Sequence, residues 1–490
     1  LPWFVLLWLI CWSGSLKFPL MLSDDQQNSL RNKPAHHVTR NDNDAGSAME
    51  ILYIVTSMAE YDNGFRNTQR GRDRFRDTLV SVVAEATHSM IATGYQVDVY
   101  LIAHYELLPE RRDMLRERLP DGVGLEIWDD ATPLGYGQPG DTQLALDGSL
   151  YVQPISRALS RQHRYVIKDK CKYYDMFVSF EDDMLIRGEH VHLHMEMTQE
   201  INRLKKGAPI RYAGDDSNKN PAKERFYGPL TRIQLARMIP GWIRVEVIPD
   251  KEEFLEKREQ QLMTLPISEE SMKEARSLDP TICCHRDQLF PENKNGTEKA
   301  LQLPMMEDIF LWETQSAALG LHKIPNASSL DWVVLQAGID QTHIPQEKVI
   351  GEYWTGKALP LDNIERPNPT APQYISNQGG WVATREQIFT WHRGHCKGQL
   401  LPPFDDMDGM KNNVEFWSGG ISLIGMNSCQ LQRIISLDPK DFSRHMVYHT
   451  SNNKQKSKHL AFTSVIDFWS QLRTAQARAE QSFSVKARVH

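Results

Sequence analysis

The sequence lacks an excess of positive charge and several of the short motifs that identify large enzyme classes. Its 490 residues include 56 Lys and Arg against 63 Asp and Glu, for a net charge of −7, which argues against a nucleic-acid partner held by a basic surface. No Gly-x-Gly-x-x-Gly follows the first predicted strand and no Walker sequence occurs, which disfavours an ordinary dinucleotide site and a P-loop. No Gly-x-Ser-x-Gly occurs either, which disfavours a serine hydrolase with a nucleophile elbow.

Cysteine is scarce and is not spaced for zinc. Of the six Cys, one lies in the apolar N-terminal segment, which leaves an odd number for the rest of the chain. No two of them have the C-x-x-C spacing of a zinc or redox motif. We therefore predict one or two disulfides, with Cys396–Cys429 as the first choice, and at least one thiol that is free or paired between chains.

The sequence opens with an apolar segment, and a polar segment follows. Residues 1–22 are predicted to be a membrane-spanning signal anchor, truncated at its start because no initiator Met precedes it. The apolar region of a cleaved signal peptide remains the alternative. Residues 23–48 are polar and free of Phe, Trp and Tyr, and are predicted to be a flexible stem. Together with glycosylation sequons at Asn295 and Asn326, these segments indicate a membrane-attached protein whose body is lumenal or secreted.

Strand and helix patterns alternate after the stem. Apolar runs typical of buried strands occur at 50–57, 95–103 and 123–128, and helical patterns separate them at 71–92 and 108–119. Strand, helix, strand, helix, strand is the β-α-β pattern of a parallel sheet. The predicted fold class is therefore α/β, with a mixed, mostly parallel central sheet flanked by helices.

Three adjacent acids end the next predicted strand. The run Tyr174–Phe180 is mostly aromatic and apolar, and Glu181, Asp182 and Asp183 follow it before an apolar stretch resumes. Adjacent carboxylates at the end of a buried strand repel one another, and apolar flanks add to the cost of desolvating them. A divalent cation removes that cost because hard cations take oxygen ligands. The pattern predicts a metal site, and a solvated acidic turn is the alternative.

Further motifs occur nearer the C-terminus. Gly379 and Gly380, which allow a backbone to approach a ligand closely, precede a short apolar strand, and Thr384 is predicted to cap the helix after it. An acidic cluster at 405–408 and a second acidic position at Glu415 come next. A polar loop at the end of the folded region contains Lys454.

In this order, the motifs resemble those of the nucleotide-sugar glycosyltransferases with the GT-A fold. The Glu-Asp-Asp sequence at 181–183 is similar to the DXD-type motif of the N-acetylglucosaminyltransferase I group. The resemblance covers residues 49–455 as an ordered set: a β-α-β half, an acidic strand end, a glycine loop with a later acid, and a terminal His. It implies a GT-A catalytic domain over residues 49–485, with an insertion or second lobe at about 249–345.

The resemblance implies an activity and a cellular location. The implied reaction moves a sugar from a nucleoside-diphosphate donor to a hydroxyl of a glycan or glycoprotein acceptor, with Mn²⁺ or Mg²⁺ as cofactor. The implied protein is a single-pass type II protein of the Golgi or ER membrane with its catalytic body in the lumen. The implied metal ligands are Asp183 and Asp182, joined by a late His, for which we favour His449 over His445 because it follows an apolar run and precedes a polar loop.

Donor-binding residues follow from the same arrangement. The loop after the first strand faces the nucleotide in Rossmann-like half-sheets, so Tyr61 can stack on a base and Arg66 can reach the phosphates; a solvated loop is the alternative. The stretch 149–172 is predicted to be a helix with a basic side, and Lys168 is its candidate for the donor, while a solvated face is the alternative for most of its basic residues. The full set of predicted donor-binding residues is Glu181, Asp182, Tyr61, Arg66, Lys168, Gly379, Gly380 and Lys454.

The predicted catalytic base depends on the stereochemistry of the reaction. An inverting enzyme needs a carboxylate after the glycine loop to activate the acceptor hydroxyl, and the candidates are Glu415, Asp406 and Asp405. Glu415 best matches the family pattern, but Phe416 stands where that pattern has a second acid. A retaining enzyme needs no such base, so the choice stays open. A calcium-binding or merely solvated turn is the other interpretation of the cluster at 405–408.

Two other functions remain as alternatives. A lumenal metal-dependent phosphatase or nucleotidase would also use an acidic strand end, although such enzymes usually gather more His and Asp ligands at neighbouring strand ends. A non-catalytic carbohydrate-binding scaffold could retain the same fold, and such a protein would tolerate the loss of Asp183.

Overall fold

The computed structural model of the chain describes most of the residues between 48 and 473. The described residues are 48–59, 76–131, 142–144, 150–152, 159–208, 232–236, 238–248, 269–284, 305–313, 319–321, 332–335, 380–394, 396, 400–402, 431–451, 461–470 and 472–473. The predicted signal anchor and all but the last residue of the predicted stem lie outside them. Within these ranges no helix combines the length and the apolar character needed to cross a membrane.

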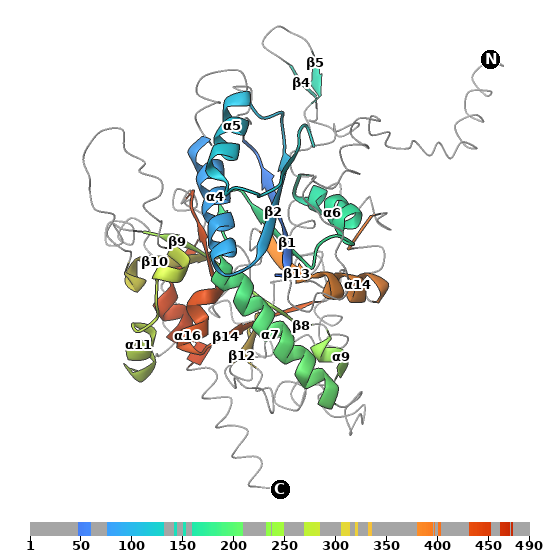
Figure 1. The fold of residues 1–490 in the computed structure, drawn as a ribbon. Helices are drawn as coiled ribbons and strands as arrows, with labels where there is room; N and C mark the ends of the chain where they lie inside the picture. The colour runs from blue at the N-terminus through green and yellow to red at the C-terminus, as the bar shows by residue number, and fades with distance from the viewer. Residues whose placement is uncertain are drawn as a thin grey trace, which may run out of the picture. The chain divides into compact units, whose positions relative to one another are not determined.

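A five-stranded sheet forms the N-terminal part of the fold (Figure 1). In spatial order its strands are β13 (Gly380–Thr384), β6 (Met176–Glu181), β1 (Glu50–Ser57), β2 (Gln96–Ala103) and β3 (Leu125–Trp128). β6, β1, β2 and β3 are parallel, and β13 joins the edge antiparallel to β6. The residues of β1 after Glu50 are all buried, as expected for a strand covered on both faces. The predicted α/β class with a mostly parallel central sheet is confirmed.

Helices cover the two faces of this sheet (Figure 1). α4 (Arg76–Ala92) packs with the side chains of Ile51, Tyr53 and Val55 that point to one face of β1. α6 (Leu159–Lys170) contacts β1, β2 and β6 from the other side. Gly94 ends α4 with a φ of +98°, a left-handed conformation that glycine adopts without a steric penalty.

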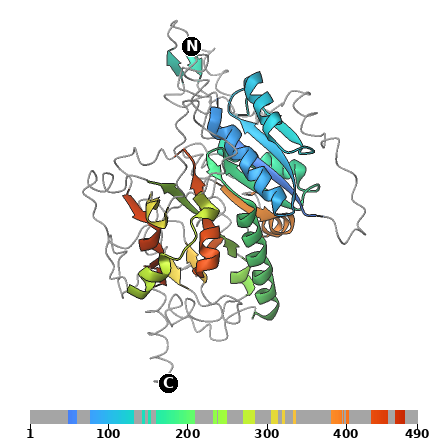
Figure 2. The same ribbon diagram turned by 60° about the vertical axis from the view of Figure 1, so that its left-hand side comes forward.

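Two further sheets, one of five strands and one of four, hold most of the C-terminal elements. One has the order β16 (Ala461–Ser464), β10 (Ile309–Glu313), β9 (Ile243–Val247), β15 (Met446–His449) and β7 (Met184–Leu185). The other has the order β11 (Leu319–Leu321), β12 (Trp332–Leu335), β14 (Gln432–Ser436) and β8 (Met238–Pro240). Figure 2 shows strands from the yellow-green and red parts of the chain side by side, so segments distant in sequence build these sheets together. The predicted insertion at 249–345 contributes β10, β11 and β12 to them.

The remaining elements are short apart from two helices. α7 (Gly188–Gly207) follows β7, and α5 (Pro109–Arg118) lies between β2 and β3. The others are β4 (Thr142–Leu144), β5 (Leu150–Val152), α9 (Arg232–Leu235), α11 (Glu269–Ala275), α12 (Thr281–Cys284), η2 (Met306–Asp308), α14 (Arg385–Arg393), α16 (Pro439–Phe442) and η4 (Ser443–His445).

Local sequence signals predict several boundaries correctly and one helix incorrectly. Thr384 caps α14 as predicted, because its hydroxyl accepts a hydrogen bond from Gln387 N while the Gln387 side chain accepts one from Thr384 N. The single helix predicted over 149–172 is wrong, since Leu150–Val152 form a strand and the helix begins at Leu159. Pro154 explains the difference, because proline disfavours the helical conformation of the residue before it.

The cysteines also follow the prediction in part. Cys283 and Cys284 form a disulfide with each other at the end of α12, and Cys171 is free. Cys396 is disulfide-bonded, but Cys429, its predicted partner, lies outside the described residues. At least one free thiol was predicted, and Cys171 confirms it.

Gly380 is required by strand packing. A Cβ built on Gly380 would lie 2.1 Å from Ser179 O and 2.4 Å from a ring carbon of Phe180. We therefore expect Gly380→Ala to lower the free energy of unfolding by about 1–3 kcal/mol, because β13 would have to move away from β6. Urea unfolding measures this loss. Gly207→Ala is the matched control, since a Cβ at Gly207 meets nothing within 4 Å; equal unfolding free energies for the two variants would contradict the prediction.

Candidate functional site

The three predicted acids lie where the chain passes from one sheet to another. Glu181 is the last residue of β6 in the first sheet, and Met184 is the first residue of β7 in the second. Asp182 and Asp183 form the turn between them. The sheet extends from β1 in two directions, with β2 and β3 on one side and β6 on the other. The order in which the chain adds strands therefore reverses between β1 and β6. In open α/β sheets, this edge at the carboxyl ends of the strands is where ligands bind.

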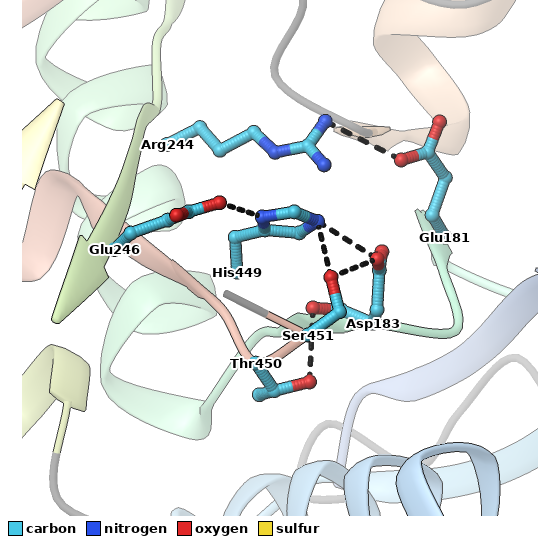
Figure 3. A network of polar contacts seen from close by, with 7 residues as sticks. All are labelled: Glu181, Asp183, Arg244, Glu246, His449, Thr450 and Ser451. Atoms are coloured by element: carbon cyan, nitrogen blue, oxygen red, sulfur yellow. Dashed lines mark hydrogen bonds and ion pairs between the residues drawn. The ribbon is translucent and has the colours of Figure 1, made fainter. Parts of the chain in front are cut away.

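Strand pairing brings His449 to this turn. β15 pairs antiparallel with β7, with His449 opposite Met184, the residue after Asp183. His449 Nε2 lies 2.8 Å from Asp183 Oδ2, although the two residues are 266 positions apart in the sequence (Figure 3). The backbone is fixed at the same point, because Thr450 N donates to Asp183 O at 2.8 Å and Thr450 Oγ1 donates to it at 3.1 Å.

A neighbouring strand adds two charged side chains. β9 pairs parallel with β15 and carries Arg244 and Glu246, which alternate with apolar residues and so point to the same face. Glu246 is fully buried, and its Oε1 lies 2.5 Å from His449 Nδ1. Arg244 Nη1 lies 3.5 Å from Glu181 Oε2. Figure 3 shows the two side chains reaching across the site from β9 toward His449 and the acidic turn.

Hydroxyl groups hold the two aspartates in place. Ser57 Oγ, at the carboxyl end of β1, donates to Asp182 Oδ2 at 2.5 Å. Ser451 Oγ lies 2.9 Å from Asp183 Oδ2 and 2.8 Å from His449 Nε2, so it connects the carboxylate with the imidazole (Figure 3). These contacts fix both aspartates without removing Asp183 from solvent, since its side chain is 20% exposed.

The two aspartates differ strongly in acidity. Burial raises the pKa of Asp182, and the neighbouring Asp183 and Glu181 raise it further, against the opposing effects of Ser57 and Arg111. Burial also raises the pKa of Asp183, but His449, Arg244 and the Ser451 hydroxyl outweigh this effect and leave its pKa below the usual range. Asp183 is therefore the carboxylate that stays ionised, and its negative charge would attract a cation.

The arrangement could hold a divalent cation if ligands from outside the protein complete its coordination. Within the described ranges, no group of three or more His, Cys, Asp and Glu is arranged to hold a metal by itself. A cation that works on nucleotides needs only one or two carboxylates from the protein, because the phosphates and water supply the other ligands. Asp183 and His449 provide a carboxylate oxygen and an imidazole nitrogen that lie 2.8 Å apart, a combination of ligands suited to a transition-metal ion such as Mn²⁺.

Glu246, His449 and Ser451 also have the spacing of an acid, a base and a nucleophile. Ser451 Oγ is within hydrogen-bond distance of Nε2, and Glu246 holds Nδ1. However, the Asp183 carboxylate lies against the same hydroxyl, and its negative charge would oppose the negative charge that develops during attack on a carbonyl group. The electrostatics of the site therefore favour a bound cation over acyl transfer.

Several predicted site residues lie outside the described part of the chain. These are Tyr61, Arg66, Gly379, Asp405, Asp406, Glu415 and Lys454. The structure brings together Glu181, Asp182, Asp183 and His449. Gly380 lies opposite Phe180 in β6, one residue before the acids, where its role is the strand contact described above.

Lys168 does not lie beside these acids. It is exposed near the C-terminal end of α6, and a short connection leads from there to the N-terminal end of β6. Lys168 and Asp183 are therefore at opposite ends of that strand. The basic side predicted for this helix is also not uniformly solvated, because Arg164 is buried with 2% exposure. Burial and the nearby Arg161 lower the pKa of Arg164 to about 9.

Sequence reasoning missed Arg244, Glu246, Ser57 and Ser451. Two opposite charges at alternate positions of the short strand Ile243–Val247 are the one signal that could have marked the first two, because charges rarely occur in a buried strand without a partner. Ser57 and Ser451 carry no comparable signal. Comparison with known proteins adds no relative, since no family model and no curated protein matches this sequence.

Proposed function

We propose that the protein is a metal-dependent glycosyltransferase with the GT-A fold. It would move a sugar from a nucleoside-diphosphate donor to a hydroxyl of a glycan or glycoprotein acceptor, with its body in the lumen of the Golgi or ER and an N-terminal membrane anchor. The observation that carries the proposal is the contact between Asp183 and His449 at the carboxyl end of β6. The resemblance in sequence motifs assigns the same two residues to a metal.

The proposed roles follow from the contacts of the site. Asp183 and His449 would hold Mn²⁺ or Mg²⁺, with Asp182 beside them. When bound, the metal acts as a Lewis acid on the departing diphosphate. Ser57 and Ser451 keep the aspartate side chains in place through the hydrogen bonds described above. Arg244, next to Glu181, supplies a positive charge that stabilises the negative charge of the departing phosphate.

Nucleotide binding by the full chain tests this function. Thermal unfolding is measured with UDP, GDP or CMP, each with and without Mn²⁺, and the best nucleotide is then offered as its sugar conjugates with mixed glycan acceptors. We expect one nucleoside diphosphate to raise the unfolding temperature only when Mn²⁺ is present, and we expect mass spectrometry to detect the transferred sugar. A folded protein that responds to no nucleotide would favour the carbohydrate-binding scaffold.

The same samples separate transfer from phosphate-ester hydrolysis. A phosphatase or nucleotidase releases inorganic phosphate from the nucleotide, whereas a glycosyltransferase releases the intact nucleoside diphosphate. Phosphorus NMR distinguishes these products directly. Release of inorganic phosphate without formation of a glycan product would replace the proposed function with the nucleotidase alternative.

A further inference from the structure

We propose that Glu246 is a positioning residue that fixes the ring orientation of His449 for metal binding. The inference rests on the proposed function, because it assigns a role to a residue behind the proposed metal ligand. Glu246 lies on β9, is fully buried, and places Oε1 2.5 Å from His449 Nδ1 (Figure 3). Neither the acidic strand end nor the late His in the sequence indicates this residue.

The contact decides which imidazole nitrogen faces the site. A neutral imidazole has one N–H donor and one acceptor nitrogen. A carboxylate beside Nδ1 accepts the hydrogen bond from Nδ1–H, so Nε2, which lies 2.8 Å from Asp183 Oδ2, is the nitrogen that would bind a cation held by that carboxylate. Histidines that bind metals commonly donate their second ring N–H to a carboxylate in this way, which fixes the ring and makes the ligand nitrogen more basic.

The backbone around His449 is fixed by strand pairing, so the bond to Glu246 acts on the orientation of the imidazole ring. Pairing of β15 with β7 and β9 fixes the main chain at His449, and Thr450 ties the next residue to Asp183 O. Rotation of the ring by half a turn would replace Nε2 with a carbon atom. The bond to Glu246 opposes that rotation, because the ring would lose its charge-assisted hydrogen bond from Nδ1–H to the carboxylate.

Metal affinity measures the role of Glu246 without any enzymatic assay. Mn²⁺ is titrated into the full-length wild type, Glu246→Gln and Glu85→Gln by isothermal calorimetry, in the presence of the nucleoside diphosphate that raises the unfolding temperature of the wild type, with circular dichroism to confirm that each variant is folded. The amide of Gln can donate to Nδ1 as well as accept from Nδ1–H, so both imidazole tautomers become populated, and the tautomer that carries the proton on Nε2 cannot bind a metal through that nitrogen. We expect Glu246→Gln to bind Mn²⁺ about 10–100-fold more weakly than the wild type.

Glu85→Gln is the matched control for a buried carboxylate. Glu85 is 3% exposed and pairs with Arg187 between α4 and the start of α7. Its substitution is expected to lower the unfolding temperature and leave the affinity for Mn²⁺ unchanged. A general structural lesion would instead weaken Mn²⁺ binding in both variants.

A spectroscopic readout identifies the imidazole directly. Electron spin echoes of bound Mn²⁺ contain a ¹⁴N modulation when an imidazole nitrogen is a ligand. We expect this modulation in the wild type and in Glu85→Gln, and a weaker one in Glu246→Gln. If the wild type binds Mn²⁺ with the modulation and Glu246→Gln matches it in affinity and signal, the positioning role is refuted and the proposed function stands. If the wild type binds no Mn²⁺, both fail.

Discussion

Replacement of Asp183 with Asn is expected to abolish the Mn²⁺-dependent stabilisation by a nucleoside diphosphate and to reduce sugar transfer at least about 100-fold. Asn retains the size of Asp, so it can still contact Ser451 Oγ and His449 Nε2, while the backbone contacts of Thr450 are unaffected. It lacks the negative charge of Asp183, whose lowered pKa keeps its carboxyl group ionised. Stabilisation of a leaving group by a metal contributes several kcal/mol, and about 1.4 kcal/mol changes a rate tenfold.

A second aspartate beside the same strand gives a matched control. Asp175 immediately precedes β6 and contacts Arg385 at 2.9 Å, whereas Asp183 lies just beyond the other end of the strand. Asp175→Asn therefore removes a similar charge and a similar ion pair without touching the site. We expect this variant to bind nucleotide and Mn²⁺ like the wild type. Equal responses from the two variants, or an unaltered response in Asp183→Asn, would favour the scaffold alternative.

Local patterns were sufficient to predict the first sheet. The apolar run at 50–57 matches β1 residue for residue, and the acids at 181–183 follow β6 as predicted. Parallel strands buried on both faces give continuous apolar runs that few other elements give. The basic residues within 149–172 recur at helical spacing, but that spacing does not mark the start of the helix, which begins at Leu159, after Pro154.

The other half of the site depends on strand pairing that no local pattern reveals. His449 was predicted from its place in the order of motifs and from the apolar run before it, and the pairing of β15 with β7 is what brings it beside Asp183. Glu246 meets His449 across 203 positions of sequence because β9 pairs with β15. The order of strands in a mixed sheet is set by packing of the whole domain, so residues on β9 could not be assigned from their neighbours in sequence.

Three buried histidines surround Trp242 and make the fold sensitive to acid. His190 and His194 on α7 and His445 in η4 are each fully buried, and their rings lie 6.0–6.4 Å from the Trp242 ring between centroids. Burial lowers the pKa of His190 and His194 to about 4 and that of His445 to about 3, from an ordinary value of 6.5. All three are therefore neutral in the folded protein at neutral pH.

The sign of the pH dependence follows from these pKa values. Below about pH 6.5 the unfolded chain binds a proton at each of the three histidines, whereas the folded protein binds none of them until about pH 4. The free energy of unfolding that the three neutral histidines contribute is fully present above pH 6.5 and is lost as the pH falls. Three protons reduce the free energy of unfolding by about 4 kcal/mol per pH unit. Asp182 acts in the opposite direction, because its raised pKa lets the folded protein bind a proton first; the net slope is therefore smaller than the histidine contribution.

Two histidines on α7, one buried and one half exposed, allow the contribution of a single buried histidine to the pH dependence to be measured. His194 is buried and makes a 3.3 Å contact with Gln387, whereas His192 is half exposed two residues earlier on the same helix. The free energy of unfolding in urea is measured between pH 5 and pH 6.5 for the wild type, His194→Gln and His192→Gln. We expect His194→Gln to reduce the slope by about 1.4 kcal/mol per pH unit, and His192→Gln serves as the exposed control from the same helix. Equal slopes for all three proteins would show that His194 already binds a proton in the folded state, contrary to its burial.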